Sequence, residues 1–178
     1  WQNMVQKSYD LIAQRKASLD RKEWDQALDR NAQALAVDPD NKDRYAKDED
    51  GIREAASGNF LSSAEESIRA RDYGKAAKFI ETARKYKDAF KAQELLDTIS
   101  QRRKAEDLMS KAEGLVDSKE YRQALPVYDE ILALDPDNGR ARKSVAEIYR
   151  ILGEEALKKG SLLEAAASYK KSKAVAAS

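Results

Sequence analysis

The chain has 178 residues, of which 42% are apolar and 37% are charged. Its 33 Lys and Arg residues balance 32 Asp and Glu residues, and this net charge of +1 argues against a nucleic-acid partner, which needs a clear basic excess. Cysteine and histidine are both absent, so we expect no catalytic residue, no metal site and no cofactor. Abundant alanine, with only 7 glycines and 3 prolines, predicts an all-α protein.

No apolar run is long enough to span a bilayer, so we expect no direct membrane insertion of this segment. The chain opens at Trp1 rather than at methionine, which predicts an excerpt of a longer protein. The localisation stays open, with the bacterial periplasm and the cytoplasm as the alternatives.

Four segments share one pattern, in which a bulky residue is followed, three positions later, by alanine and a second apolar residue. The bulky residues are Trp24, Tyr73, Tyr121 and Leu162. The pattern continues seven and ten positions after each of them, and offsets of three, four and seven mark one face of a helix. Asp-Pro-Asp-Asn closes the first and third copies at residues 38–41 and 135–138, where proline stops one helix and asparagine suits the N-cap of the next. Taken in chain order, the copies predict four hairpins of two antiparallel helices, over residues 5–39, 42–87, 88–136 and 138–176.

These residues resemble the tetratricopeptide repeat, a unit of two antiparallel helices with small residues at fixed crossing points. The small residue nine positions before the bulky one is Ala64, Ala112 and Gly153 in the last three copies, but Arg15 in the first. The resemblance implies a right-handed α-solenoid of four helix hairpins, forming a single domain over residues 1–178.

The spacing of the copies exceeds that of the family. The bulky residues lie 49, 48 and 41 residues apart, whereas the family period is about 34. The surplus is about four, four and two helical turns, which predicts unusually long first helices. We expect them over residues 42–71 and 88–118, with a kink or break near Gly51 or residues 57–59 in the former.

The resemblance also implies a groove lined by the first helix of each hairpin. The residues at its lining positions include Ile12, Lys16, Asp20, Leu61 and Glu65, and the expected partner-binding groove consists of Arg69, Met109, Glu113, Asp117, Arg150, Glu154 and Lys158. Both signs of charge, with an apolar residue in most copies, suit a protein or peptide partner. The alternative for each of these residues is an ordinary solvated helix face.

The first functional hypothesis is therefore a non-catalytic scaffold that binds a peptide or protein partner within a larger assembly. The alternative is a structural spacer or self-association module without a dedicated peptide groove. The last copy favours self-association through Leu163, Ala166, Ala167 and Tyr169, because a terminal repeat needs a polar cap. This hypothesis predicts that Tyr169→Glu abolishes a dimer. A membrane-docking helical bundle is a third hypothesis, but no helix is basic enough on one side to favour it.

Overall fold

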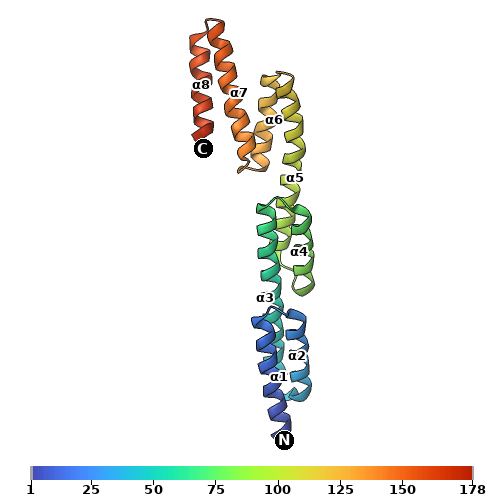
Figure 1. Ribbon diagram of the computed structural model, residues 1–178. Coiled ribbons are helices and arrows are strands. Elements are labelled where there is room, and N and C mark those ends of the chain that lie inside the picture. Colours follow the sequence, from blue (N-terminus) through green and yellow to red (C-terminus); the bar gives the residue numbers. More distant parts are fainter. Residues whose placement is uncertain (1, 178) are drawn as a thin grey trace. The chain divides into compact units, whose positions relative to one another are not determined.

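The computed structural model describes residues 2–177, and over this range the protein is all-α, with eight α-helices, one short 3₁₀ helix and no strand (Figure 1). The elements are α1 (Gln2–Asp20), α2 (Trp24–Val37), η1 (Pro39–Asn41), α3 (Lys42–Arg69), α4 (Tyr73–Tyr86), α5 (Phe90–Asp117), α6 (Tyr121–Leu134), α7 (Gly139–Lys158) and α8 (Leu162–Ala177). The predicted all-α class is confirmed. The arrangement of the hairpins as a right-handed α-solenoid stays a prediction.

The chain divides into two compact units, Trp1–Asp97 and Thr98–Ser178, and the boundary falls within α5. In the first unit α1 packs on α2, α2 on α3, and α3 on α4. In the second unit α6 packs on α7, and α7 on α8 (Figure 1). Three of the predicted hairpins, α1–α2, α3–α4 and α7–α8, are thus formed by helices that are adjacent in sequence.

The first helices α3 and α5 are long, as the spacing predicts. Each has 28 residues, or about 42 Å at 1.5 Å per residue. The predicted break in α3 is wrong, because the helix continues without interruption through Gly51 and Gly58. Ile52 and Ala56 are buried on this helix, and their burial outweighs the roughly 1 kcal/mol that each glycine costs in a helix interior.

The turn inside each hairpin has the same backbone geometry. Its central residue has a left-handed conformation, with φ values of 59° at Lys22, 59° at Arg71, 61° at Lys119 and 76° at Gly160. In the third hairpin the amide of Glu120 donates to the carbonyl of Leu115 at 2.8 Å, which closes a Schellman motif. The corresponding bond recurs in the other three hairpins. The same turn geometry therefore precedes the second helix in all four hairpins.

The two Asp-Pro-Asp-Asn segments begin the next helix differently. Asn138 Oδ1 accepts a hydrogen bond from the backbone amide of Ala141 at 3.1 Å, which is the predicted N-cap of α7. Asn41 makes no such cap, and its side chain instead donates to the Asp38 carboxylate at 2.9 Å. The proline stops both preceding helices as predicted, but the cap forms only in the second unit.

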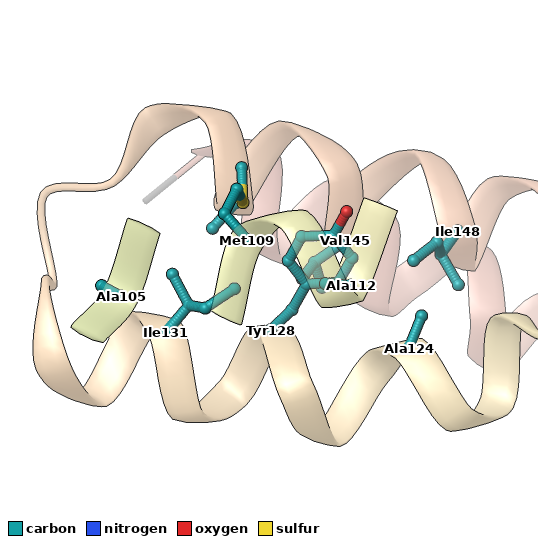
Figure 2. Packing of buried hydrophobic residues seen from close by; sticks show 9 residues of the cluster. Ala105, Met109, Ala112, Ala124, Tyr128, Ile131, Val145 and Ile148 are labelled. Atoms are coloured by element: carbon teal, nitrogen blue, oxygen red, sulfur yellow. The ribbon is translucent and has the colours of Figure 1, made fainter. Parts of the chain in front are cut away.

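The core of the second unit lies where α5, α6 and α7 meet (Figure 2). Small side chains there allow the helices to approach closely, while large ones fill the space between them. The cluster consists of Ala105, Met109, Ala112, Ala124, Tyr128, Ile131, Ala141, Val145 and Ile148. Ala112 and Tyr128 are the residues that the repeat pattern places nine positions before and seven positions after the bulky residue, and both are buried.

The first hairpin replaces this apolar contact with a polar cluster. Arg15 stands at the position of Ala112, and Asn31 at that of Tyr128. The Arg15 guanidinium donates to Asn31 Oδ1 and pairs with Asp48 of α3 at 2.6 Å. Asn31, which is 2% exposed, donates from Nδ2 to the carbonyl of Tyr45 at 2.8 Å. The departure of Arg15 from the small-residue pattern is thus matched by a polar residue opposite it.

The ring of Tyr169 lies directly against Gly153, so the fold requires a residue without a side chain at this position. A Cβ atom on Gly153 would lie 2.9 Å from Tyr169 Cε1, whereas a Cβ atom on Gly114 of α5 would meet nothing within 4 Å. Gly114→Ala is therefore expected to raise the free energy of unfolding by up to about 1 kcal/mol through helix propensity. Gly153→Ala is expected to lower it by about 1 kcal/mol, because overpacking outweighs the same propensity gain.

Urea unfolding followed by circular dichroism measures both glycine variants. Equal stabilisation by the two substitutions would contradict the close contact between Gly153 and Tyr169.

A hydrogen bond from the Tyr86 hydroxyl to Asp25 Oδ1, 2.9 Å long, connects α4 with α2. Burial raises the pKa of Tyr86 to about 12, and the hydrogen bond and the negative charge of Asp25 add to this effect. Because folding raises this pKa, protonated Tyr86 stabilises the folded protein. This contribution to stability is complete below pH 10, the ordinary pKa of tyrosine, and is lost as the pH rises towards 12.

Difference titration of tyrosinate absorbance between the wild type and Tyr86→Phe is expected to show this late ionisation. In an Asp25→Asn background, Tyr86 should ionise at lower pH, although burial still keeps its pKa above the ordinary value. An unchanged titration in that background would contradict the role of Asp25.

Candidate functional site

Six of the seven predicted groove residues lie on two helices of the second unit. Met109, Glu113 and Asp117 are spaced four residues apart on α5, and Arg150, Glu154 and Lys158 are spaced in the same way on α7. Residues four positions apart lie on one side of a helix, so each triplet forms a row. The seventh residue, Arg69, is exposed at the end of α3 in the first unit.

Three of the five charged members of these rows, Glu113, Arg150 and Glu154, are already paired within the chain. Arg150 forms ion pairs with Glu147 at 2.5 Å and with Glu154, both on α7. The hydrogen bond to Arg150 lowers the pKa of Glu147 and raises the pKa of Arg150. Glu113 pairs with Arg140 from the start of α7 at 2.7 Å. A partner would have to displace these exposed pairs before it could bind the same groups.

Two of the three apolar positions of the predicted lining are not open to a partner. Met109 is 5% exposed and belongs to the core of the second unit (Figure 2). Leu61 is 5% exposed in the first unit. Placing them on an open groove surface is therefore wrong, because both side chains fill the space between helices. Whether the charged residues of the rows bind a partner stays a prediction.

The other lining positions lie in the first unit. Lys16 and Asp20 are exposed on α1, and Ile12 is half-buried. Glu65 pairs with Lys91 of α5 at 2.5 Å, and its hydrogen bond raises the pKa of Lys91. These residues are spread over separate helices, and the sequence pattern alone placed them together.

A groove that the sequence did not predict lies beside α1. It has a volume of about 440 Å³ and is bounded by α1, the end of α2, η1 and the start of α3. Met4, Val5 and Tyr9 line it and are strongly exposed, and Ile12 and Val37 line it and are half-buried. The crowding of five apolar residues within positions 4–12 was the available signal, because one core-facing side of a helix accommodates fewer.

The C-terminal hairpin exposes a second apolar surface on α8. Leu162 is 70% exposed and Leu163 is 89% exposed, and Ala166 and Ala167 beside them are exposed as well. Three of these four residues are among those predicted for self-association. Tyr169, the fourth predicted residue, is half-buried against Gly153. Tyr169→Glu would therefore disturb the hairpin itself and is a poor test of an interface.

Within residues 2–177, no three acidic side chains gather closely enough to hold a metal ion. None of the helices in that range is both long and apolar enough to cross a bilayer.

Residues 86–169 match the family described as alkyl sulfatase dimerisation. The match covers slightly less than half of the chain, including all of α5, α6 and α7 and the first half of α8. No curated protein matches the chain.

This match corrects the resemblance to the tetratricopeptide repeat, which is wrong. The third copy of the pattern, from Ala112 to Pro136, lies entirely within the matched segment. Small residues where helices cross are a general requirement of close helix packing, so the pattern predicts hairpins without identifying a family. Over residues 86–169 the chain is similar to the alkyl sulfatase dimerisation family.

Proposed function

We propose that this segment is a non-catalytic self-association module that joins two copies of the chain. The observation that carries the proposal is the match of residues 86–169 to a family described by dimerisation. The exposed leucines of the last hairpin add support, because burying apolar side chains of this size against a partner lowers the free energy. The proposal assigns no reaction to the segment, since the sequence has no histidine, no cysteine and no phosphate-binding glycine loop.

Peptide binding in the predicted groove has less support. Met109 is buried, and Glu113, Arg150 and Glu154 are paired within the chain. Self-association uses side chains that are already exposed and requires no ion pair to break.

Sedimentation equilibrium of the whole chain tests the proposal. We expect a mass that rises with concentration from one 20.0 kDa chain towards two. The range should extend over concentrations on the order of 1 to 100 µM, which brackets an association of moderate strength. A single-chain mass throughout that range would overturn the proposal.

A further inference from the structure

The outward side of α8 differs in composition from that of the other second helices. One and five positions after the start of α2, the chain has Asp25 and Asp29, and all four corresponding residues of α4 and α6 are glycine, lysine, arginine or proline. In α8 these positions are Leu163 and Ala167. An apolar pair therefore stands where the other copies carry no large apolar side chain.

A neighbouring side of α8 is also less covered than in the other copies. Seven positions into the second helix, Asn31, Ile80 and Tyr128 are at most 2% exposed, whereas Tyr169 is half-buried. The helices α2 and α6 are covered by the first helices that follow them, α3 and α7. No helix follows α8 within the described residues. The two open sides meet in what we term the α8 surface, which consists of Leu162, Leu163, Ala166, Ala167, Lys170 and Lys173.

We propose that the α8 surface is where a second copy of this chain docks, through the same surface of that copy, with the two helices crossing near Ala166. This inference rests on the proposed self-association. The alanines allow close approach of the two helices, and Leu162 and Leu163 supply the apolar area that is buried. Lys170 and Lys173 lie about one and two turns beyond the crossing, so their ammonium groups reach water at the rim.

Head-to-tail stacking, with α1 of one copy covering α8 of the next, is disfavoured by the composition of α1. Where α7 presents buried Ala141, Val145 and Ile148 to α6, the corresponding residues of α1 are Asn3, Lys7 and Asp10. All three are exposed. Covering them with α8 would take the charged groups of Lys7 and Asp10 out of water, which is costly. A closed pair that uses the same surface twice avoids this cost.

The charge of the α8 surface gives the dimer a salt dependence of known sign. Both copies bring Lys170 and Lys173, and no acidic side chain belongs to the surface. Like charges across an interface repel, and added salt screens the repulsion. The dimer is therefore expected to tighten as the salt concentration rises. An acidic protein partner on the same surface would give the opposite dependence.

Leu163→Lys tests the surface in sedimentation equilibrium. Phe90→Lys is the matched control, because Phe90 is also 89% exposed but lies at the start of α5, in the first unit. We expect Leu163→Lys to weaken the dimer at least about tenfold and Phe90→Lys to leave it unchanged. We expect the double variant Lys170→Ala/Lys173→Ala to strengthen the dimer at low salt.

A single cysteine supplies a second readout that does not depend on weakening the dimer. The chain has no cysteine of its own, so any disulfide formed by a single-cysteine variant joins two copies. Under mild oxidation with diamide, Ala166→Cys is expected to cross-link rapidly in the soluble, folded protein. Ser118→Cys, at the exposed turn after α5, is the control that should remain largely uncross-linked.

The outcomes separate this inference from the proposed function. A wild type that is monomeric at all concentrations would overturn both and leave α8 to a different partner. A wild-type dimer that survives Leu163→Lys, or that shows no preferential cross-link at Ala166→Cys, would overturn the α8 surface alone. A dimer that loosens as salt rises would equally overturn a contact between two copies of this basic surface.

Discussion

Tyr128→Ala is expected to lower the free energy of unfolding by about 3 to 5 kcal/mol, because a large buried ring is lost and a cavity remains. Tyr128 is 1% exposed and lies among the buried side chains of α5, α6 and α7. Tyr9→Ala makes the same chemical change at a side chain that is 65% exposed. The control is expected to change the free energy of unfolding by no more than about 0.5 kcal/mol.

Urea unfolding followed by circular dichroism at equal protein concentration compares the two tyrosine variants. Equal losses would contradict the placement of Tyr128 at the centre of the second unit. The m-value, which is the dependence of the free energy of unfolding on urea concentration, should stay unchanged. Neither variant greatly alters the surface area exposed on unfolding.

Arg15→Ala is expected to cost about 2 to 3 kcal/mol, because it leaves the buried amide oxygen of Asn31 without its donor and removes the partner of Asp48. Asn31→Ile alone is also expected to destabilise, since it sets an apolar side chain against the Arg15 guanidinium. Combining the two substitutions restores the small and apolar residues that the other copies have at these positions. The double variant is expected to unfold with a free energy within about 1 kcal/mol of the wild type. Neither the Arg15 guanidinium nor the Asn31 amide is then left buried without its partner.

A double-mutant cycle measured by urea unfolding determines this coupling. Losses that simply add would show that Arg15 and Asn31 contribute independently, which would contradict the polar cluster. The Asp48 carboxylate is not left buried without a partner in the Arg15 variants, because it is partly exposed and water can solvate it.

The sequence predicted the hairpins well, because they depend on local signals. Prolines at 39 and 136, and the two turn residues before each bulky position, define helix ends through backbone geometry alone. The 28-residue lengths of α3 and α5 followed from the surplus of whole helical turns between copies. The break near Gly58 was wrongly predicted because burial of Ile52 and Ala56, a tertiary effect, overrides the weak local preference of glycine.

The candidate site was less predictable, since it depends on which side chains remain open after packing. Met109 was placed on a groove by a pattern that could not distinguish a lining residue from a core residue at the same helical spacing. The groove at Met4 and Tyr9 was missed for the converse reason, because exposed apolar residues carry the same periodic signal as buried ones. Leu163 was identified because it lies in the last copy, where the repeat pattern itself predicts an open side.

The polar cluster of the first hairpin has a consequence for how the chain sorts its own helices during folding. Four hairpins with similar turns and crossings offer each first helix several plausible second helices. Arg15 facing Ile80 or Tyr128 would be buried without an acceptor, whereas Asn31 supplies one. Arg15 therefore favours packing of α1 on α2 over packing of α1 on α4 or α6. A single pair of residues thus disfavours swapped pairings in a chain whose hairpins have similar sequences.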